Sequence, residues 1–227
     1  MSDNHDDATA DLLIKEVDED LRHEQLEQMW KRYGGLLVAV ALALVLAVAG
    51  WQAWRSWEGK QRRASSLRYS QATQLAANGR LDQALAALAK LSTDGTSGYR
   101  LLADMKRAAL EEDKGDLAGA SALYHSVAAA GGNDPVYRDL ALLKASYIDL
   151  DSGDPAAIAK AVAPLTEDTS PWRYSAREVT ALAALKRGDT VTAGDLFRKL
   201  ADDLAAPQGV RARATEMLAT LQSKAKN

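Results

Sequence analysis

A long stretch without charge runs from Gly34 to Trp54 and reads GGLLVAVALALVLAVAGWQAW. Gln52 is its only polar residue. A charge at the bilayer centre costs about 2.5–3.5 kcal/mol on insertion scales, so an uncharged stretch of this length is typical of a membrane span. It reaches the roughly 20 residues that a ~30 Å hydrocarbon core requires. We therefore predict one transmembrane helix over 34–54.

Aromatic residues stand at both ends of this stretch. Trp30 and Tyr33 precede it, and Trp51 and Trp54 follow it. A helix rises about 1.5 Å per residue, so Tyr33 and Trp51 are separated by about 27 Å. Indole and phenol rings favour the headgroup level, and we predict that these four residues lie at the two membrane interfaces. The alternative is a buried helix of a soluble domain, which does not require such flanks.

Small residues recur at every fourth position of the predicted span, at Gly35, Ala39, Ala43 and Ala47. Such a stripe lets a second transmembrane helix approach closely, so these four are candidate transmembrane packing residues. In a chain this rich in alanine, chance is the alternative explanation.

The segment before the span is acidic. Residues 1–35 carry ten acidic and four basic side chains, a net charge of −6. Leu13, Val17 and Leu21 recur with helical spacing, which predicts an amphipathic helix that is either solvated or a docking helix for a partner. Residues 47–49 (Ala-Val-Ala) match a signal-peptide cleavage site, but a secretory amino-terminal region is short and basic. We expect an uncleaved anchor rather than a signal peptide.

Residues 55–63 form a basic linker, and the remaining residues, 64–227, have the composition of a helical domain. Alanine is abundant, phenylalanine occurs once and cysteine is absent. The lack of cysteine excludes disulfides and thiol catalysis. Residues 55–227 carry a net charge of +3 without a basic, aromatic-rich stripe, so we predict no nucleic-acid partner.

The domain repeats itself with a period of about 36 residues. Pro135, Pro171 and Pro207 are spaced by 36 and 36 residues. Four glycines are each followed five residues later by a small or apolar residue, which gives the pairs Gly79/Ala84, Gly115/Ala120, Gly153/Ile158 and Gly188/Ala193. Gly in a left-handed conformation ends a helix, an aspartate such as Asp82, Asp154 or Asp189 caps the next one, and the small residue lies where the two helices cross.

This pattern predicts an all-α solenoid. We expect four helical hairpins, over 64–92, 99–130, 135–165 and 171–205, and a capping helix over 208–224 that closes the open end. Proline fits the first helical turn, so the repeat prolines should begin hairpins. The third unit departs from the pattern, because Ile158 replaces the crossing alanine and Pro155 begins its second helix.

A two-helix unit of this length with this Gly-to-Ala spacing resembles the tetratricopeptide repeat. Together with the stretch Gly50-Trp51-Gln52-Ala53-Trp54 and the Glu-Val-Asp-Glu-Asp-Leu segment at 16–21, the whole chain is similar to the YfgM family. The resemblance implies a single-pass protein of the bacterial inner membrane, with a cytoplasmic amino terminus and a periplasmic repeat domain. It also implies partners, namely the Sec translocon and periplasmic chaperones or clients, and it carries no catalytic residues.

Charge alone does not decide the orientation. Lys15, Arg22, Lys31 and Arg32 precede the span, and Arg55, Lys60, Arg62, Arg63 and Arg68 follow it. By the positive-inside rule this favours a cytoplasmic repeat domain, but the rule weakens for long domains. The resemblance favours the opposite orientation.

The sequence contains no constellation for catalysis, cofactor, metal or small-molecule binding. His5, His23 and His125 lack metal-site spacing, and no nucleophile elbow or phosphate-binding loop occurs. Tyr137-Arg138 and Trp172-Arg173 recur after the repeat prolines, either for binding or, as we favour, for packing against the previous hairpin. By their register in the first helices of the hairpins, the candidates for a protein-binding groove are Tyr69, Met105, Tyr147 and Glu178.

These features predict a membrane-anchored helical-repeat adaptor that binds proteins at or near the Sec translocon and assists their folding or assembly. The alternative is a structural scaffold for an envelope or division complex that binds no clients. An enzyme is the third class, and no residue pattern favours it.

Overall fold

The computed structural model describes residues 4–132 and 134–224, and the side chains of 30–132 and 134–223. These residues contain helices and no strand, which confirms the all-α prediction. The chain divides into two compact units, one ending at Lys60 and the other beginning at Gln61. The predicted amphipathic face of 11–32 lies almost wholly outside the residues whose side chains are described.

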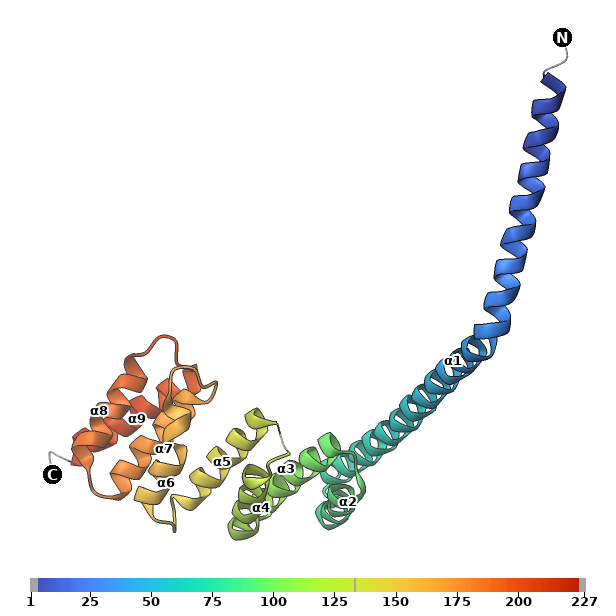
Figure 1. Cartoon of the computed structure of the whole chain (residues 1–227). Helices are drawn as coiled ribbons and strands as arrows, with labels where there is room; N and C mark the ends of the chain where they lie inside the picture. The colour runs from blue at the N-terminus through green and yellow to red at the C-terminus, as the bar shows by residue number, and fades with distance from the viewer. Residues whose placement is uncertain (1–3, 133, 225–227) are drawn as a thin grey trace. The chain divides into compact units, whose positions relative to one another are not determined.

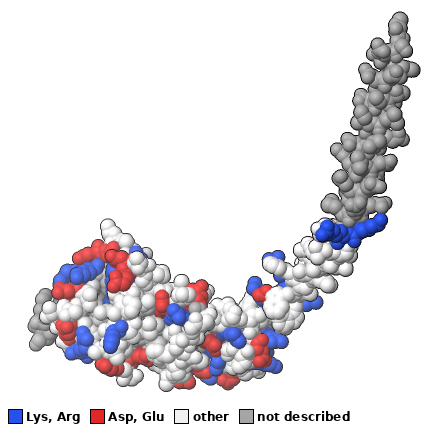
Figure 2. Space-filling model, viewed as in Figure 1, with Lys and Arg blue, Asp and Glu red and all other residues white. Residues whose placement is uncertain are grey.

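The first unit contains most of helix α1 (Asn4–Ala77), which also supplies the first helix of the second unit. From Trp30 onward α1 is long and apolar enough, by length and composition, to cross a membrane. Its apolar side chains are not buried by protein; Leu46, for example, is 72% exposed. Figure 2 shows this stretch as an uncharged band along the helix. Exposed apolar surface costs about 25 cal/mol per Å² in water, so this unburied surface is unfavourable in water.

The second unit is built of hairpins that follow one another along the chain (Figure 1). The end of α1 pairs with α2 (Leu81–Asp94), and α3 (Ser97–Lys114) pairs with α4 (Leu117–Ala129). Next come α5 (Pro135–Asp149) with α6 (Pro155–Val162) and its continuation η1 (Ala163–Thr166), then α7 (Arg173–Lys186) with α8 (Thr190–Asp202). The final helix is α9 (Gln208–Lys224). Four hairpins and a closing helix therefore occur where the repeat pattern predicts them.

Three of the four repeat glycines end helices in the left-handed conformation. Gly79, Gly115 and Gly188 have φ of 75°, 85° and 80°. After α3, the backbone N–H of Asp116 donates to the carbonyl of Glu111 and that of Gly115 donates to Glu112, at 2.9 and 3.0 Å. This pair of bonds satisfies carbonyls that the helix end would leave unpaired, and it requires the positive φ that glycine permits.

Gly153 departs from this prediction. It has no positive φ, because α5 ends at Asp149 and a longer turn connects it to α6. A Cβ atom at Gly153 would lie 2.9 Å from the carbonyl oxygen of Asp149. Glycine is needed here for close backbone approach rather than for a left-handed helix end.

Aspartates cap most of the second helices. Asp154 accepts hydrogen bonds from the backbone N–H groups of Ala156 and Ala157, and Asp189 accepts one from Thr192. The prediction for Asp82 was wrong, because Arg80 occupies the cap position and makes no side-chain cap bond. Asp82 lies in the first turn instead and pairs with Lys114 at 3.0 Å.

The repeat prolines differ in their positions relative to the helices. Pro135 is the first residue of α5, but Pro171 lies two residues before α7 and is not part of it. The Ser170 hydroxyl there accepts a hydrogen bond from the Trp172 backbone N–H at 3.1 Å. The prediction that Pro171 begins a helix is therefore wrong, because a turn precedes α7.

The core runs as a series of clusters, each of which joins one hairpin to the next. Ala84, Ala120 and Ala193 are fully buried at the predicted crossings, and Tyr124 and Phe197 are buried one turn later. Each cluster also takes buried residues from the following first helix, as Ala103 and Leu110 of α3 pack on the α1–α2 hairpin. The last cluster is closed by Val210 and Ala214 of α9.

Candidate functional site

The first helices of successive hairpins contact one another and are the elements that a protein-binding groove would use. The rings of Tyr69 on α1 and Tyr99 on α3 lie 6.1 Å apart. Lys144 of α5 lies 3.5 Å from the carboxylate of Glu112 on α3. The Tyr147 hydroxyl of α5 donates to Glu178 of α7 at 2.9 Å. Burial, followed by the charge of Tyr137 on α5, raises the pKa of Tyr69.

The four predicted groove residues do not form one open surface. Tyr69 and Tyr147 are half-buried, and Met105 packs on the core cluster between α3 and α4. The expectation that Glu178 lines an accessible groove is wrong, because its side chain is only 4% exposed. It is enclosed by the partners that neutralise it.

Glu178 is the centre of a polar relay that we define as Tyr147, Glu178 and Arg213. Arg213 of α9 donates from Nε and Nη2 to the two carboxylate oxygens, both at 2.6 Å. Burial and the charge of Glu178 raise the pKa of Tyr147, and the hydrogen bond to Glu178 raises that of Arg213. The relay connects α5, α7 and α9 through one buried carboxylate, and its geometry serves cohesion rather than ligand binding.

A second polar cluster joins the α3–α4 hairpin to α5. Glu112 accepts from Tyr124 at 3.2 Å, and burial followed by the Glu112 charge raises the pKa of Tyr124. Asp149 accepts from the Ser121 hydroxyl at 2.6 Å and contacts Nε2 of His125 at 2.7 Å. The Ser121 hydroxyl and the His125 ring each contact this carboxylate rather than each other.

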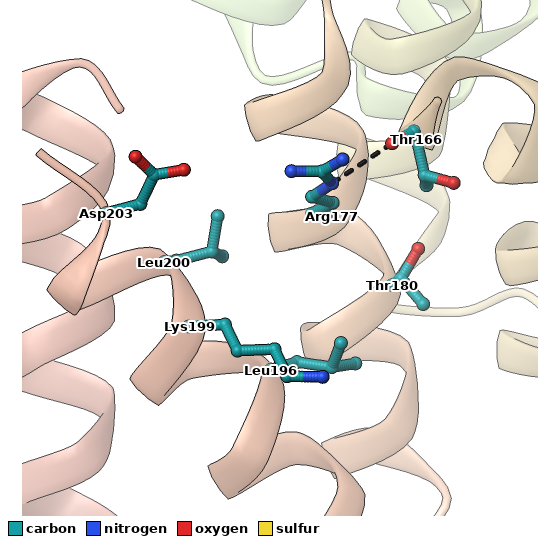
Figure 3. A pocket seen from close by; sticks show the side chains of 7 residues that line it. All are labelled: Thr166, Arg177, Thr180, Leu196, Lys199, Leu200 and Asp203. Atoms are coloured by element: carbon teal, nitrogen blue, oxygen red, sulfur yellow. Dashed lines mark hydrogen bonds between the residues drawn. The ribbon is translucent and has the colours of Figure 1, made fainter. Parts of the chain in front are cut away.

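A pocket of about 420 Å³ lies between η1, α7 and α8 (Figure 3). Arg177 is held at its edge, because Nε donates to the Thr166 carbonyl at 3.0 Å and Nη2 pairs with Asp168 at 2.5 Å. The remaining lining mixes charged and aliphatic side chains, namely Thr180, Leu196, Lys199, Leu200 and Asp203. A second cavity of about 620 Å³ lies between the α7 end, α8 and α9, with Val191, Leu218 and Leu221 in its wall.

Within the part of the chain whose side chains are described, no group of three or more metal-ligating residues occurs. The side chains of His5 and His23 lie outside that part. The relay, the Asp149 cluster and the two pockets were missed by sequence reasoning. The spacing of 35 residues between Glu178 and Arg213 is close to the repeat period and is the signal that indicates their proximity.

In the first unit, the predicted interface residues are exposed. Trp51 and Trp54 are 65% and 66% exposed, and Trp30 and Tyr33 are exposed as well. Basic side chains lie over two of the rings, Arg32 at 5.7 Å from the Tyr33 centroid and Arg55 at 5.4 Å from that of Trp51. The stripe Gly35, Ala39, Ala43 and Ala47 is also exposed.

Comparison with known proteins gives one family. The tetratricopeptide repeat-like domain matches residues 27–211, a range that includes the apolar stretch of α1 and all four hairpins. No curated protein and no solved structure matches the chain. Because the match spans well over half of the 227 residues and agrees with the hairpins that the structure shows, the chain belongs to the tetratricopeptide repeat-like domain family.

Proposed function

We propose that this protein is a membrane-anchored adaptor whose repeat domain binds other proteins beside the Sec translocon. The observation that carries the proposal is the combination of one unburied apolar helix with a solenoid of hairpins in the same chain. Solenoids of this kind present extended binding surfaces formed by successive repeats. Families of tetratricopeptide-like repeats are generally non-catalytic interaction modules, so we propose no enzymatic activity.

The proposed organisation follows the chain. Residues 1–33 form a cytoplasmic segment, 34–54 span the inner membrane, 55–63 form the basic linker and 64–227 form a periplasmic repeat domain. The resemblance to the YfgM family supports this orientation and the choice of the translocon. The exposed aromatic residues Trp51 and Trp54 support the position of the second interface.

Site-specific photo-crosslinking in intact cells tests this function. A photoreactive residue replaces Tyr137, which is exposed at the start of α5, and in a matched variant it replaces Thr220, which is exposed on α9. We expect translocon subunits and secretory chains to be crosslinked from Tyr137 and not from Thr220. One folded partner in stoichiometric amount would identify a scaffold instead, and the absence of any envelope partner at either position would contradict both functions.

A further inference from the structure

An arginine recurs at the same repeat position in four successive units. The arginine row, as we name it, consists of Arg100, Arg138, Arg173 and Arg211, each within the first four residues of α3, α5, α7 or α9. The four arginines are spaced by 38, 35 and 38 residues. The first two of these spacings equal those between the glycines at 115, 153 and 188, which are 38 and 35. The residues that precede the row are Tyr99, Tyr137, Trp172 and Val210.

Stability of the isolated helices does not explain this placement. The amino-terminal end of a helix carries a partial positive charge, so a cation near it is unfavourable by several tenths of a kcal/mol. The hairpin pattern demands glycine at the turn and a small residue at the crossing, and it demands no cation here. A residue type that recurs against local preference indicates a role beyond the fold.

The row also lacks carboxylate partners. Among the side chains that the structure describes, no aspartate or glutamate pairs with any of the four, as is also true of Arg80 and Arg187. Arg173 instead donates to the Ser170 carbonyl at 3.3 Å and lies over the Tyr174 ring. Nε of Arg138 and Nε of Arg211 are buried and have no hydrogen-bond partner. A buried donor left unpaired costs about 1–3 kcal/mol.

The helices that carry the row contact one another. Lys144 of α5 lies 3.5 Å from the carboxylate of Glu112 on α3. Nε1 of Trp172, just before α7, donates to the carbonyl of Val136 on α5 at 3.2 Å. Arg213 and Glu178 join α9 to α7 in the same way. Packed helices lie about 8–10 Å apart, so the row advances by about 10 Å per unit. An extended chain rises about 3.3 Å per residue, which makes one step of the row equal to three residues.

We propose that the arginine row binds an extended acidic segment of a partner protein that presents a carboxylate at every third residue. The planar guanidinium pairs with a carboxylate through two parallel hydrogen bonds, and it does so better than an ammonium group. Tyr137, exposed beside Arg138, offers an apolar ring to the residues between the carboxylates. This inference rests on the proposed protein-binding function and names the chemistry of the segment that is bound.

Fluorescence anisotropy with the full-length chain in neutral detergent tests it. The probe is a labelled peptide of about ten residues, the length that four units span, with glutamate at every third position. A permuted peptide of the same composition has its glutamates adjacent. We expect tighter binding of the first peptide and at least about tenfold weaker binding by R100Q/R138Q, because charged hydrogen bonds are lost.

The control variant is R187Q/R198Q, which removes the same charge from exposed positions at the end of α7 and on α8. It should bind like the wild type. Arg100 is exposed, so R100Q alone should leave the fold unchanged. We expect this single variant to bind the first peptide more weakly than the wild type and more tightly than R100Q/R138Q. Equal affinity for both peptides, or the same loss in the control variant, would overturn the inference.

The same variants separate this inference from the proposed function. If R100Q/R138Q still crosslinks to the translocon from Tyr137 while neither peptide binds, only the acidic-segment inference is wrong. If the wild type gives no crosslinks from Tyr137, the proposed adaptor function is wrong, whatever the peptides show. A third outcome would assign the row to lipid headgroups and contradict the inference. In that case the wild type binds vesicles that contain phosphatidylglycerol, R100Q/R138Q does not bind them, and the two peptides bind with equal affinity.

Discussion

Glu178 shows how one buried charge organises its surroundings. An unpaired carboxylate in the interior is expensive, and here it accepts two hydrogen bonds from Arg213 and one from Tyr147. Arg213 is 55% exposed, so its loss of hydration is partial while the carboxylate is almost completely enclosed. The two single substitutions therefore differ in cost. Removing the arginine leaves a buried carboxylate without a cationic partner, whereas removing the glutamate leaves a cation that water can reach.

This asymmetry predicts the result of a double-mutant cycle. Arg213→Ala should reduce the free energy of unfolding by about 2 kcal/mol, less than the 3–5 of a fully buried pair. Glu178→Ala/Arg213→Ala should cost less than the sum of the single changes, because the stranded carboxylate is gone. Urea unfolding measures the effect, with Arg198→Ala as the control for an exposed ion pair. Strict additivity would show that Arg213 and Glu178 are not coupled.

The phenols of Tyr124 and Tyr147 predict a dependence on alkaline pH. Burial, followed by a neighbouring carboxylate, raises the pKa of each above the ordinary value of 10.0. The protonated form is favoured by folding, so this contribution to stability is present below about pH 10 and is lost as the pH rises through the higher folded pKa. Absorbance titration should show late-ionising tyrosines, with Tyr124 and Tyr147 among them.

Tyr124→Phe and Tyr147→Phe should each remove one late-ionising phenol from that titration. In urea the wild-type tyrosines should ionise together, because burial and the carboxylates no longer act on them. A folded protein in which all seven tyrosines ionise together would contradict the assignment.

Each hairpin depends on a turn and on a close crossing. The left-handed glycines end the first helices, and Ala84, Ala120 and Ala193 have no exposed surface where the second helices cross them. In the third hairpin the short helix α6 continues as η1, and Ile158 takes the place of the small residue. The units therefore share one topology but differ in how closely their helices approach.

Ala193→Leu tests the crossing in the fourth hairpin. The added atoms meet the cluster around Phe197, and overpacking of this kind costs about 1–3 kcal/mol. Thr190→Leu is the matched control, because it makes a similar change at an exposed position three residues earlier. Urea unfolding of residues 61–227 should show the loss in the first variant only. Equal stability of the two variants would mean that α8 does not cross α7 at Ala193.

At the scale of the whole molecule, the two units differ in how far their apolar side chains are buried by protein. The repeat unit buries its apolar side chains between hairpins, while the apolar side chains of α1 from Leu36 to Val48 stay exposed. The charged residues of the repeat unit are interspersed over the face seen in Figure 2, as suits a water-exposed domain. The exposed apolar band of the first unit is unfavourable in water, which supports the proposed membrane span.

Protease added to spheroplasts tests the proposed orientation. We expect loss of the repeat unit and a protected fragment that contains residues 1–33, because long domains cross the membrane largely regardless of the local charge. Complete protection of residues 61–227 would place the repeat unit in the cytoplasm and remove the translocon function. Intact mass of the membrane-extracted protein checks the anchor, since a form that begins at Gly50 would show cleavage.

The sequence determined the elements of this protein. The charge-free stretch specified an apolar helix, because charge is excluded from hydrocarbon at any position along it. The period of prolines and glycines specified the four hairpins to within a few residues, because helix ends depend on local backbone chemistry at residues such as Gly79, Gly115 and Gly188. These are local rules, and the chain alone is enough to apply them.

The tertiary structure decided which side chains meet between hairpins. The register of Glu178 in its helix predicted a position in the groove. Only the packing of α9 showed that Arg213 pairs with Glu178 and helps to enclose it. Gly153 matched the repeat in sequence, but the longer turn after α5 gave it a different backbone conformation. Contacts between units depend on helix crossing and on the rotation of each hairpin about the solenoid, quantities that no single repeat encodes.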